Sequence, residues 1–280
     1  MKIYRETIVA GRTILQAYRA STRIKTKKGE KRKAKSNPTP EAVKKINLRN
    51  AIRNLTAILN NNFENMDYHL TLTYAGDEPS KEKAADDRRK FLRNIKSYCD
   101  RRGIEWKWVA VTEYENHRIH HHIVCSGIDP EVIASRWKHG WVNFKQLDDS
   151  GNYYRLAEYL IKETEKTFRL PDSVYKKRYS QSGSIVIPQI KKEEVSERVL
   201  DRDLQPYKGY YIDQDTVNRY EHAVLGVDCL ELIQVSLDPY PRFKRWSKGK
   251  VTKKEKRFKE NWSIQLSFSD EMRRGEADRT

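Results

Sequence analysis

The sequence predicts an α+β fold: a ferredoxin-like (split βαβ) antiparallel sheet with an added, tyrosine-bearing helix and extensions at both ends of the chain. Three observations predict it. Between residues 66 and 168, strand-like and helix-like segments follow the order β-α-β-β-α-β and then one more helix. The length of 280 residues is enough for a sizeable core. A hydrophobic content of 37% is too high for a chain disordered throughout.

Residues 1–65 predict an N-terminal hairpin, a basic arm and a helix. Two strand-like runs in residues 2–18 flank Ala10-Gly11, a pattern typical of a hairpin. Residues 23–35 then hold eight basic side chains and one acidic. Thr39 is a suitable N-cap with Pro40 at the first helical position, so we expect a helix from there to Asn62.

Residues 66–168 predict the central domain. Alternation and an enrichment in Thr, Val, Ile and aromatic residues indicate strands at residues 68–74, 105–114, 119–126 and 141–147. Apolar spacing of three to four residues and terminal signals such as Gly103 and Asp129-Pro130 indicate helices at residues 80–102, 129–138 and 152–166. This order gives one sheet with two helices on one face, and it leaves the last helix to cover the other face.

The rest of the chain predicts less regular structure. Residues 169–204 are polar with little periodicity and suggest a linker. Residues 205–280 form a basic, aromatic-rich accessory region with strand-like runs in 205–240 and 261–268. Its tract 242–260 holds ten basic and two acidic side chains, with Phe243, Trp246, Phe258 and Trp262 within or beside it. These rings could stack on unpaired bases or fill a core, and the sequence leaves both readings open.

The charge favours a polyanionic partner. Lys and Arg number 56 against 39 Asp and Glu, giving a net charge of +17. The two basic tracts, as arms around a nearly neutral middle, could grip a phosphate backbone; solvated tails are the plainer alternative. There is no Walker motif, no apolar run near 18 residues and no signal-peptide pattern. The three cysteines are far apart. We therefore expect a cytoplasmic, nucleic-acid-handling protein without a membrane span, a zinc ribbon or a disulfide framework.

The run Ile119–Val124 (IHHHIV) carries a candidate metal site. On a strand, His120 and His122 point to one face and His121 to the other, apolar one. Glu113 ends the preceding strand and can come opposite the histidine pair, whereas Glu115 is nearer the turn. Two imidazoles and one carboxylate suit Mn²⁺ or Mg²⁺ with coordination positions left open for substrate. A closed structural zinc site would need a fourth ligand.

The last helix of this region carries a candidate nucleophile. Tyr159 and Lys162 are three residues apart and so share one face, while Leu156 and Leu160 can anchor the helix to the sheet. A tyrosine near a metal-bound phosphate can attack phosphorus, and a lysine can lower the pKa of the phenol or brace the phosphate. The same spacing also arises by chance on many helices, so its meaning depends on its position after the histidine strand.

Three segments in this order are similar to the motifs of HUH-superfamily replication initiators: HLTLTY (69–74), TEY…RIHHHIV (112–124) and LAEYLIKE (156–163). These are the rolling-circle Rep endonucleases of plasmids, prophages and small single-stranded DNA phages. The resemblance implies that Glu113, His120 and His122 hold the metal, that Tyr159 is the nucleophile and that Lys162 assists it. His121 stands where the family usually has a hydrophobic residue. Arg155 stands where some members have a second tyrosine, which favours a single-tyrosine enzyme.

The resemblance also implies an activity and partners. Such an enzyme nicks single-stranded or hairpin origin DNA, keeps a 5′-phosphotyrosine link, and leaves a 3′-hydroxyl for a host polymerase that works with a helicase. A transposase or mobilisation relaxase would use the same chemistry on another substrate. A binding protein for single-stranded nucleic acid would form no covalent adduct, and a metal-dependent hydrolase would release a free 5′-phosphate.

Overall fold

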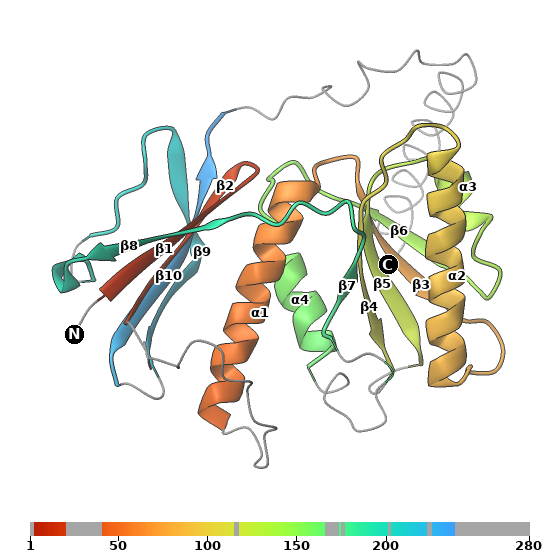
Figure 1. Ribbon diagram of the computed structural model, residues 1–280, viewed down its shortest axis with the longest axis horizontal. Coiled ribbons are helices and arrows are strands. Elements are labelled where there is room, and N and C mark those ends of the chain that lie inside the picture. The colour runs from red at the N-terminus through yellow and green to blue at the C-terminus, as the bar shows by residue number, and fades with distance from the viewer. Residues whose placement is uncertain are drawn as a thin grey trace, which may run out of the picture. The chain divides into compact units, whose positions relative to one another are not determined.

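The computed structural model describes residues 3–20, 41–114, 118–165, 174, 177–200, 203–222 and 226–238, which belong to one compact unit, Met1–Asp238. The basic tracts at 23–35 and 242–260, the expected cap at Thr39 and the run 261–268 lie outside these residues. The described part contains two antiparallel five-stranded sheets and four α-helices (Figure 1). The prediction of an α+β fold is confirmed. No helix in the described ranges is long and apolar enough to cross a bilayer.

One sheet carries the motifs singled out in the sequence. Its strand order is β6-β3-β5-β4-β7, and all its pairings are antiparallel. The strands are β3 (Tyr68–Thr73), β4 (Trp108–Glu113), β5 (His120–Cys125), β6 (Val142–Gln146) and β7 (Ser180–Gln181). With helices α2 (Lys81–Asp100) and α3 (Pro130–Ala134), the chain follows the expected β-α-β-β-α-β order from β3 to β6.

Helices α2 and α3 cover one face of this sheet. Helix α2 begins at Ser80, whose hydroxyl accepts the Lys83 N–H, and ends before Gly103, which adopts a φ of +64°. Its Phe91 and Ile95 pack on the sheet residues Leu70, Leu72 and Ile123. Helix α3 begins at its Asp129 cap and is shorter than the sequence indicates.

Helices α1 (Glu41–Asn62) and α4 (Tyr154–Glu163) cover the other face, opposite α2 (Figure 1). Leu55 and Leu59 of α1 pack with Leu160 and Ile161 of α4 against the sheet side chains Val109, Val111 and Val124. The expectation that the last helix covers the second face is therefore confirmed. Helix α1, which the sequence does not place, shares this face with it.

The second sheet joins segments from both ends of the chain. Its order is β8-β1-β2-β10-β9. The strands are β1 (Ile3–Ala10), β2 (Thr13–Ala20), β8 (Ile190–Val195), β9 (Tyr210–Glu221) and β10 (Asp228–Ser236), and a 3₁₀ turn, Glu197–Val199, follows β8. The predicted N-terminal hairpin is present, and β2 pairs directly with β10. Ala57 of α1 packs against Ile8 and Ile233 of this sheet, so α1 contacts both sheets.

Residues 169–204 contribute two strands instead of only a linker. Strand β7 pairs with β4, and strand β8 pairs with β1 over six residues. The sequence of β8, IKKEEV, has no alternation because most of its side chains are exposed. At a sheet edge, backbone hydrogen bonds to a single neighbour form the strand without an apolar face, which hides it from pattern reasoning.

Candidate active site

The strand register places three predicted ligands on one face of the β3–β6 sheet. Glu113 of β4 lies directly opposite His120 of β5, and His122 lies opposite Val111. Directly paired residues of antiparallel strands point to the same face, and alternate residues along a strand share that face. Glu113, His120 and His122 therefore lie together on the face covered by α1 and α4.

The ligand atoms of these residues converge. The His120 and His122 Nε2 atoms are 3.1 Å apart, and Glu113 Oε2 is 3.4 Å from His120 Nε2. One donor atom from each residue lies within 4.8 Å of the other two. Ions held at bonds of about 2.0–2.2 Å have ligands with separations of this order. The donor set thus fits a divalent metal, with one carboxylate and two imidazoles.

Burial prepares His122 as a ligand. It is 4% exposed, and burial, aided by the nearby His69 and His120, lowers its pKa to about 3. At neutral pH its imidazole is therefore uncharged, which metal coordination requires. Glu113 is 1% exposed, and His120 is less buried.

Helix α4 brings Tyr159 to the same cluster. The Tyr159 hydroxyl lies 3.1 Å from His122 Nε2, and the two ring centroids are 5.2 Å apart. Leu160 and Ile161 are buried beside it and fix the helix on the sheet, while Tyr159 itself is 41% exposed. Burial raises the pKa of the phenol, and the charges of Glu163 and Glu113 raise it further. The phenol is accessible and protonated in this environment.

Lys162 is on the same helix but is turned toward another residue. Its Nζ lies 2.9 Å from Glu158 Oε1 in an ion pair one turn back along α4, and its side chain is 57% exposed. The structure therefore brings Glu113, His120, His122 and Tyr159 together, and it places the Lys162 ammonium beside Glu158.

His69 is a further member of the site, and the sequence reasoning did not assign it. Its Nε2 lies 3.1 Å from His122 Nδ1, and the Thr71 hydroxyl lies 3.3 Å from the same atom. Burial lowers the pKa of His69 to about 4, with a smaller effect from Lys145. The alternation of YHLTLTY is the signal that could have found it, because His69 and Thr71 share a face of the strand next to β5.

His121 lies on the opposite face, as expected. It is fully buried, with Nδ1 2.8 Å from the Thr112 hydroxyl and Nε2 3.0 Å from the Tyr74 hydroxyl. Arg88 of α2 donates to the same Thr112 hydroxyl at 2.9 Å. Both nitrogens of His121 are thus engaged on the α2 side of the sheet, away from the cluster.

Taken together, the fold and the site define an α+β protein with a candidate divalent-metal centre beside a helix-borne phenol. Residues 67–168 match the model of a family described as replication-associated protein ORF2. The match contains every residue of the candidate site and is consistent with a replication initiator, whereas β1, β2, β8, β9 and β10 lie outside it. Searches of curated proteins and of solved structures give no significant match.

Proposed function

We propose that this protein is a replication initiator that nicks single-stranded origin DNA through a covalent 5′-phosphotyrosine intermediate at Tyr159. The observation that carries the proposal is the 3.1 Å distance between the Tyr159 hydroxyl and His122 Nε2, because it joins the phenol to the Glu-His-His cluster. The family match over residues 67–168 and the net charge of +17 support a DNA substrate at a replication origin. Host polymerase and helicase are the partners that such a reaction needs.

In the proposed reaction, Tyr159 attacks the phosphorus of one phosphodiester. A bond forms between the phenol oxygen and phosphorus, and the bond from phosphorus to the upstream 3′ oxygen breaks. The proton of the phenol passes, in net terms, to the departing oxygen, which becomes a free 3′-hydroxyl. The phosphodiester energy is kept in the tyrosyl link, so rejoining needs no ATP.

Glu113, His120 and His122 would hold Mn²⁺ or Mg²⁺, which when bound stabilises negative charge on the phosphate oxygens and favours ionisation of a nearby phenol. The chain itself supplies the rest of the arrangement. Burial keeps His122 neutral, and the packed side of α4 holds the Tyr159 ring against the cluster. Lys162, one turn further along α4, can exchange its Glu158 partner for a substrate phosphate.

The test uses the full chain, Mn²⁺ and single-stranded DNA spanning the region around the coding sequence. With 3′-labelled DNA we expect a protein-linked band that survives denaturation, and with 5′-labelled DNA a shorter strand that a polymerase can extend. Tyr159→Phe should abolish both products. Tyr211→Phe should retain them, since Tyr211 is 45% exposed on β9, close to the 41% of Tyr159, and is outside the site.

Other outcomes would contradict the proposal in distinct ways. A covalent band that persists in Tyr159→Phe excludes this nucleophile. A free 5′-phosphate without any protein–DNA band indicates a hydrolase. Binding without cleavage in every divalent metal indicates a non-catalytic binding protein. Cleavage confined to a transposon end or transfer origin indicates a transposase or relaxase.

A further inference from the structure

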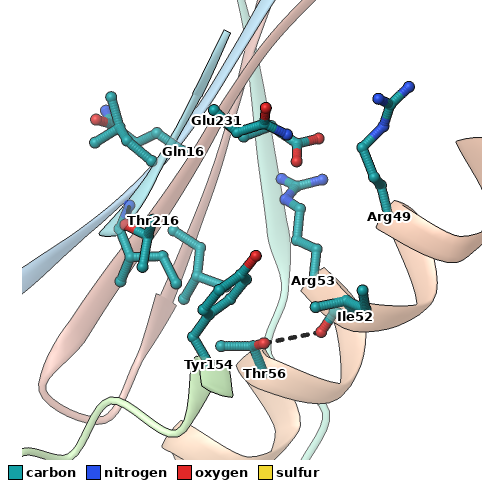
Figure 2. A pocket seen from close by; sticks show the side chains of 12 residues that line it. Gln16, Arg49, Ile52, Arg53, Thr56, Tyr154, Thr216 and Glu231 are labelled. Carbon is teal, nitrogen blue, oxygen red and sulfur yellow. Dashed lines mark hydrogen bonds between the residues drawn. The ribbon is translucent and has the colours of Figure 1, made fainter. Parts of the chain in front are cut away.

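A pocket lies away from the metal centre, between the β8–β9 sheet and helix α1 (Figure 2). It encloses about 460 Å³ of empty space, part of it open to solvent. Leu15, Ile52 and Ile233 supply apolar walls, and Arg53, Tyr154 and Glu231 supply polar groups. Figure 2 shows the Arg53 guanidinium and the Tyr154 hydroxyl directed from the helical side toward Glu231 on β10.

The Arg53 side chain is only 9% exposed and is incompletely paired. Its Nη1 donates to Glu6 Oε2 at 2.8 Å, but its Nη2 and Nε have no partner among the described residues. A buried N–H without an acceptor is unfavourable, so a ligand with acceptor atoms would be stabilised here. Glu231 uses its Oε1 for both Arg19 and Tyr220, which leaves its other carboxylate oxygen to accept from a ligand.

The charge balance decides which ligand fits. Glu6 offsets Arg53, Glu231 offsets Arg19, and the Arg49 guanidinium stacks on Tyr220 at 3.6 Å from the ring centroid. The pocket therefore has little net charge to attract a phosphate. Apolar walls, an aromatic ring and both a donor and an acceptor group suit a flat heterocycle with polar edges.

We propose that this pocket binds one guanine of the single-stranded DNA substrate. Guanine offers adjacent acceptors, O6 and N7, to a guanidinium, and adjacent donors, N1–H and N2–H, to a carboxylate. Arg53 and Glu231 provide these two partners, and Tyr154 can contact the base face or edge. This inference rests on the proposed function, and it adds a residue-level source of sequence choice.

The position of the pocket links base recognition to the chemistry. Its lining comes mainly from β2, β9, β10 and α1, which lie outside the residues that match the replication-associated family. Tyr154 is the exception, and it begins α4, the helix that carries Tyr159. Because a helix rises about 1.5 Å per residue, these two tyrosines are separated by roughly 7–8 Å along its axis. A bound base would therefore help to set which phosphate reaches Tyr159.

The experiment selects preferred sequences from a random single-stranded DNA pool with the full chain. Each guanine of the selected oligonucleotide is then replaced in turn by hypoxanthine, which lacks the N2 amino group, and binding is measured by fluorescence anisotropy. Asn218→Trp blocks the pocket from its exposed rim, and Gln214→Trp is the control on an exposed position of β9 outside the pocket. Thermal unfolding checks that both variants remain folded.

We expect the wild type and Gln214→Trp to lose at least fivefold in affinity at one guanine position, and Asn218→Trp to be insensitive at that position alone. Equal sensitivity in all three proteins overturns the proposal. Uniform weakening of Asn218→Trp at every position also overturns it, because that result indicates backbone contact. So does a wild type without any guanine preference. Nicking that proceeds normally in these cases leaves the proposed function intact, whereas absence of the covalent band refutes that function separately.

Discussion

At the scale of single residues, His122 is the centre of the candidate site, because both of its ring nitrogens are engaged. Nε2 faces His120 and Tyr159, while Nδ1 faces His69 and Thr71. A neutral imidazole can use only one nitrogen as a metal ligand when the other carries the proton. The β3 residues thus hold the tautomer and ring orientation in which Nε2 points to the cluster.

Removal of the His69 ring should therefore weaken metal binding. We expect His69→Ala to lower Mn²⁺ affinity by about 10- to 100-fold, the usual effect of losing a partner that orients a ligand. Isothermal titration calorimetry measures this without any DNA. Thr73→Ala is the matched control on the same face of β3, since the Thr73 hydroxyl bonds to the Trp141 carbonyl. Equal affinities in His69→Ala and wild type would show that His69 has no orienting role.

The sequence predicts most of the site but not its cross-strand partners. Alternation alone separates His120 and His122 from His121, because the period of a strand is two. The roles of His69 and of the Glu158–Lys162 ion pair depend on which elements pack together, and local patterns do not contain that information.

At the scale of elements, the Glu6–Arg53 ion pair connects strand β1 to helix α1. Burial alone would raise the pKa of Glu6, but the Arg53 charge and hydrogen bond, with Arg19 and Lys192, lower it overall. A carboxyl with a lowered pKa in the folded state contributes stability above its unfolded pKa of about 4.3, and this contribution is lost as pH falls through the folded value.

Stability against urea should therefore depend on Glu6 in a defined pH range. We expect Glu6→Gln to be less stable than wild type at pH 6–7, with a difference that shrinks as pH falls below about 4. Urea unfolding followed by circular dichroism at a series of pH values measures it. A difference that is constant from pH 7 to pH 3 would exclude ionisation of Glu6 as the cause.

The hairpin turn between β1 and β2 is held against α1 by close contact at Gly11. Its φ is +55°, and a Cβ at this position would lie 2.1 Å from the Asn60 carbonyl oxygen. Asn60 in turn donates to the Thr13 hydroxyl and accepts from the Tyr153 N–H, each at 2.8 Å. One helical residue thus connects the hairpin, α1 and the start of α4.

Gly11→Ala should consequently destabilise the protein by more than about 1 kcal/mol, because alanine is strained at this φ and collides with backbone. Differential scanning calorimetry measures the change in Tm. Gly183→Ala is the control, since a Cβ there meets nothing within 4 Å and its φ is not in the left-handed region. Equal Tm shifts in the two variants would contradict this account of the turn.

At the scale of the whole molecule, pattern reasoning performs best where the chain is locally consistent. Residues 66–168 carry alternation, caps and terminal glycines that agree with the final elements, including Ser80 and Gly103 around α2. The β8–β9 sheet is not predictable in this way. Its neighbours are far apart in sequence, as in the pairing of Leu15 with Ile233, and its edge strand β8 lacks an apolar face.

The net charge of +17 leads to a prediction for DNA binding. Cationic side chains that contact phosphates release counterions, so affinity falls as a power of salt concentration. We expect affinity for single-stranded DNA to fall at least about tenfold between 50 and 200 mM salt. Fluorescence anisotropy across a salt series measures the slope. An affinity independent of salt would contradict a binding mode dominated by phosphate contacts.

The pairing of β2 with β10 has a consequence for synthesis of the chain. On the ribosome, the first hairpin emerges well before its partner, and some 200 residues at about 5–20 per second separate them by roughly 10–40 seconds. During this interval the nascent β3–β6 sheet can already assemble its candidate ligands, while β2 exposes an unpaired edge. We expect the guanine pocket to form last, so that base selection is acquired only when translation has reached β10.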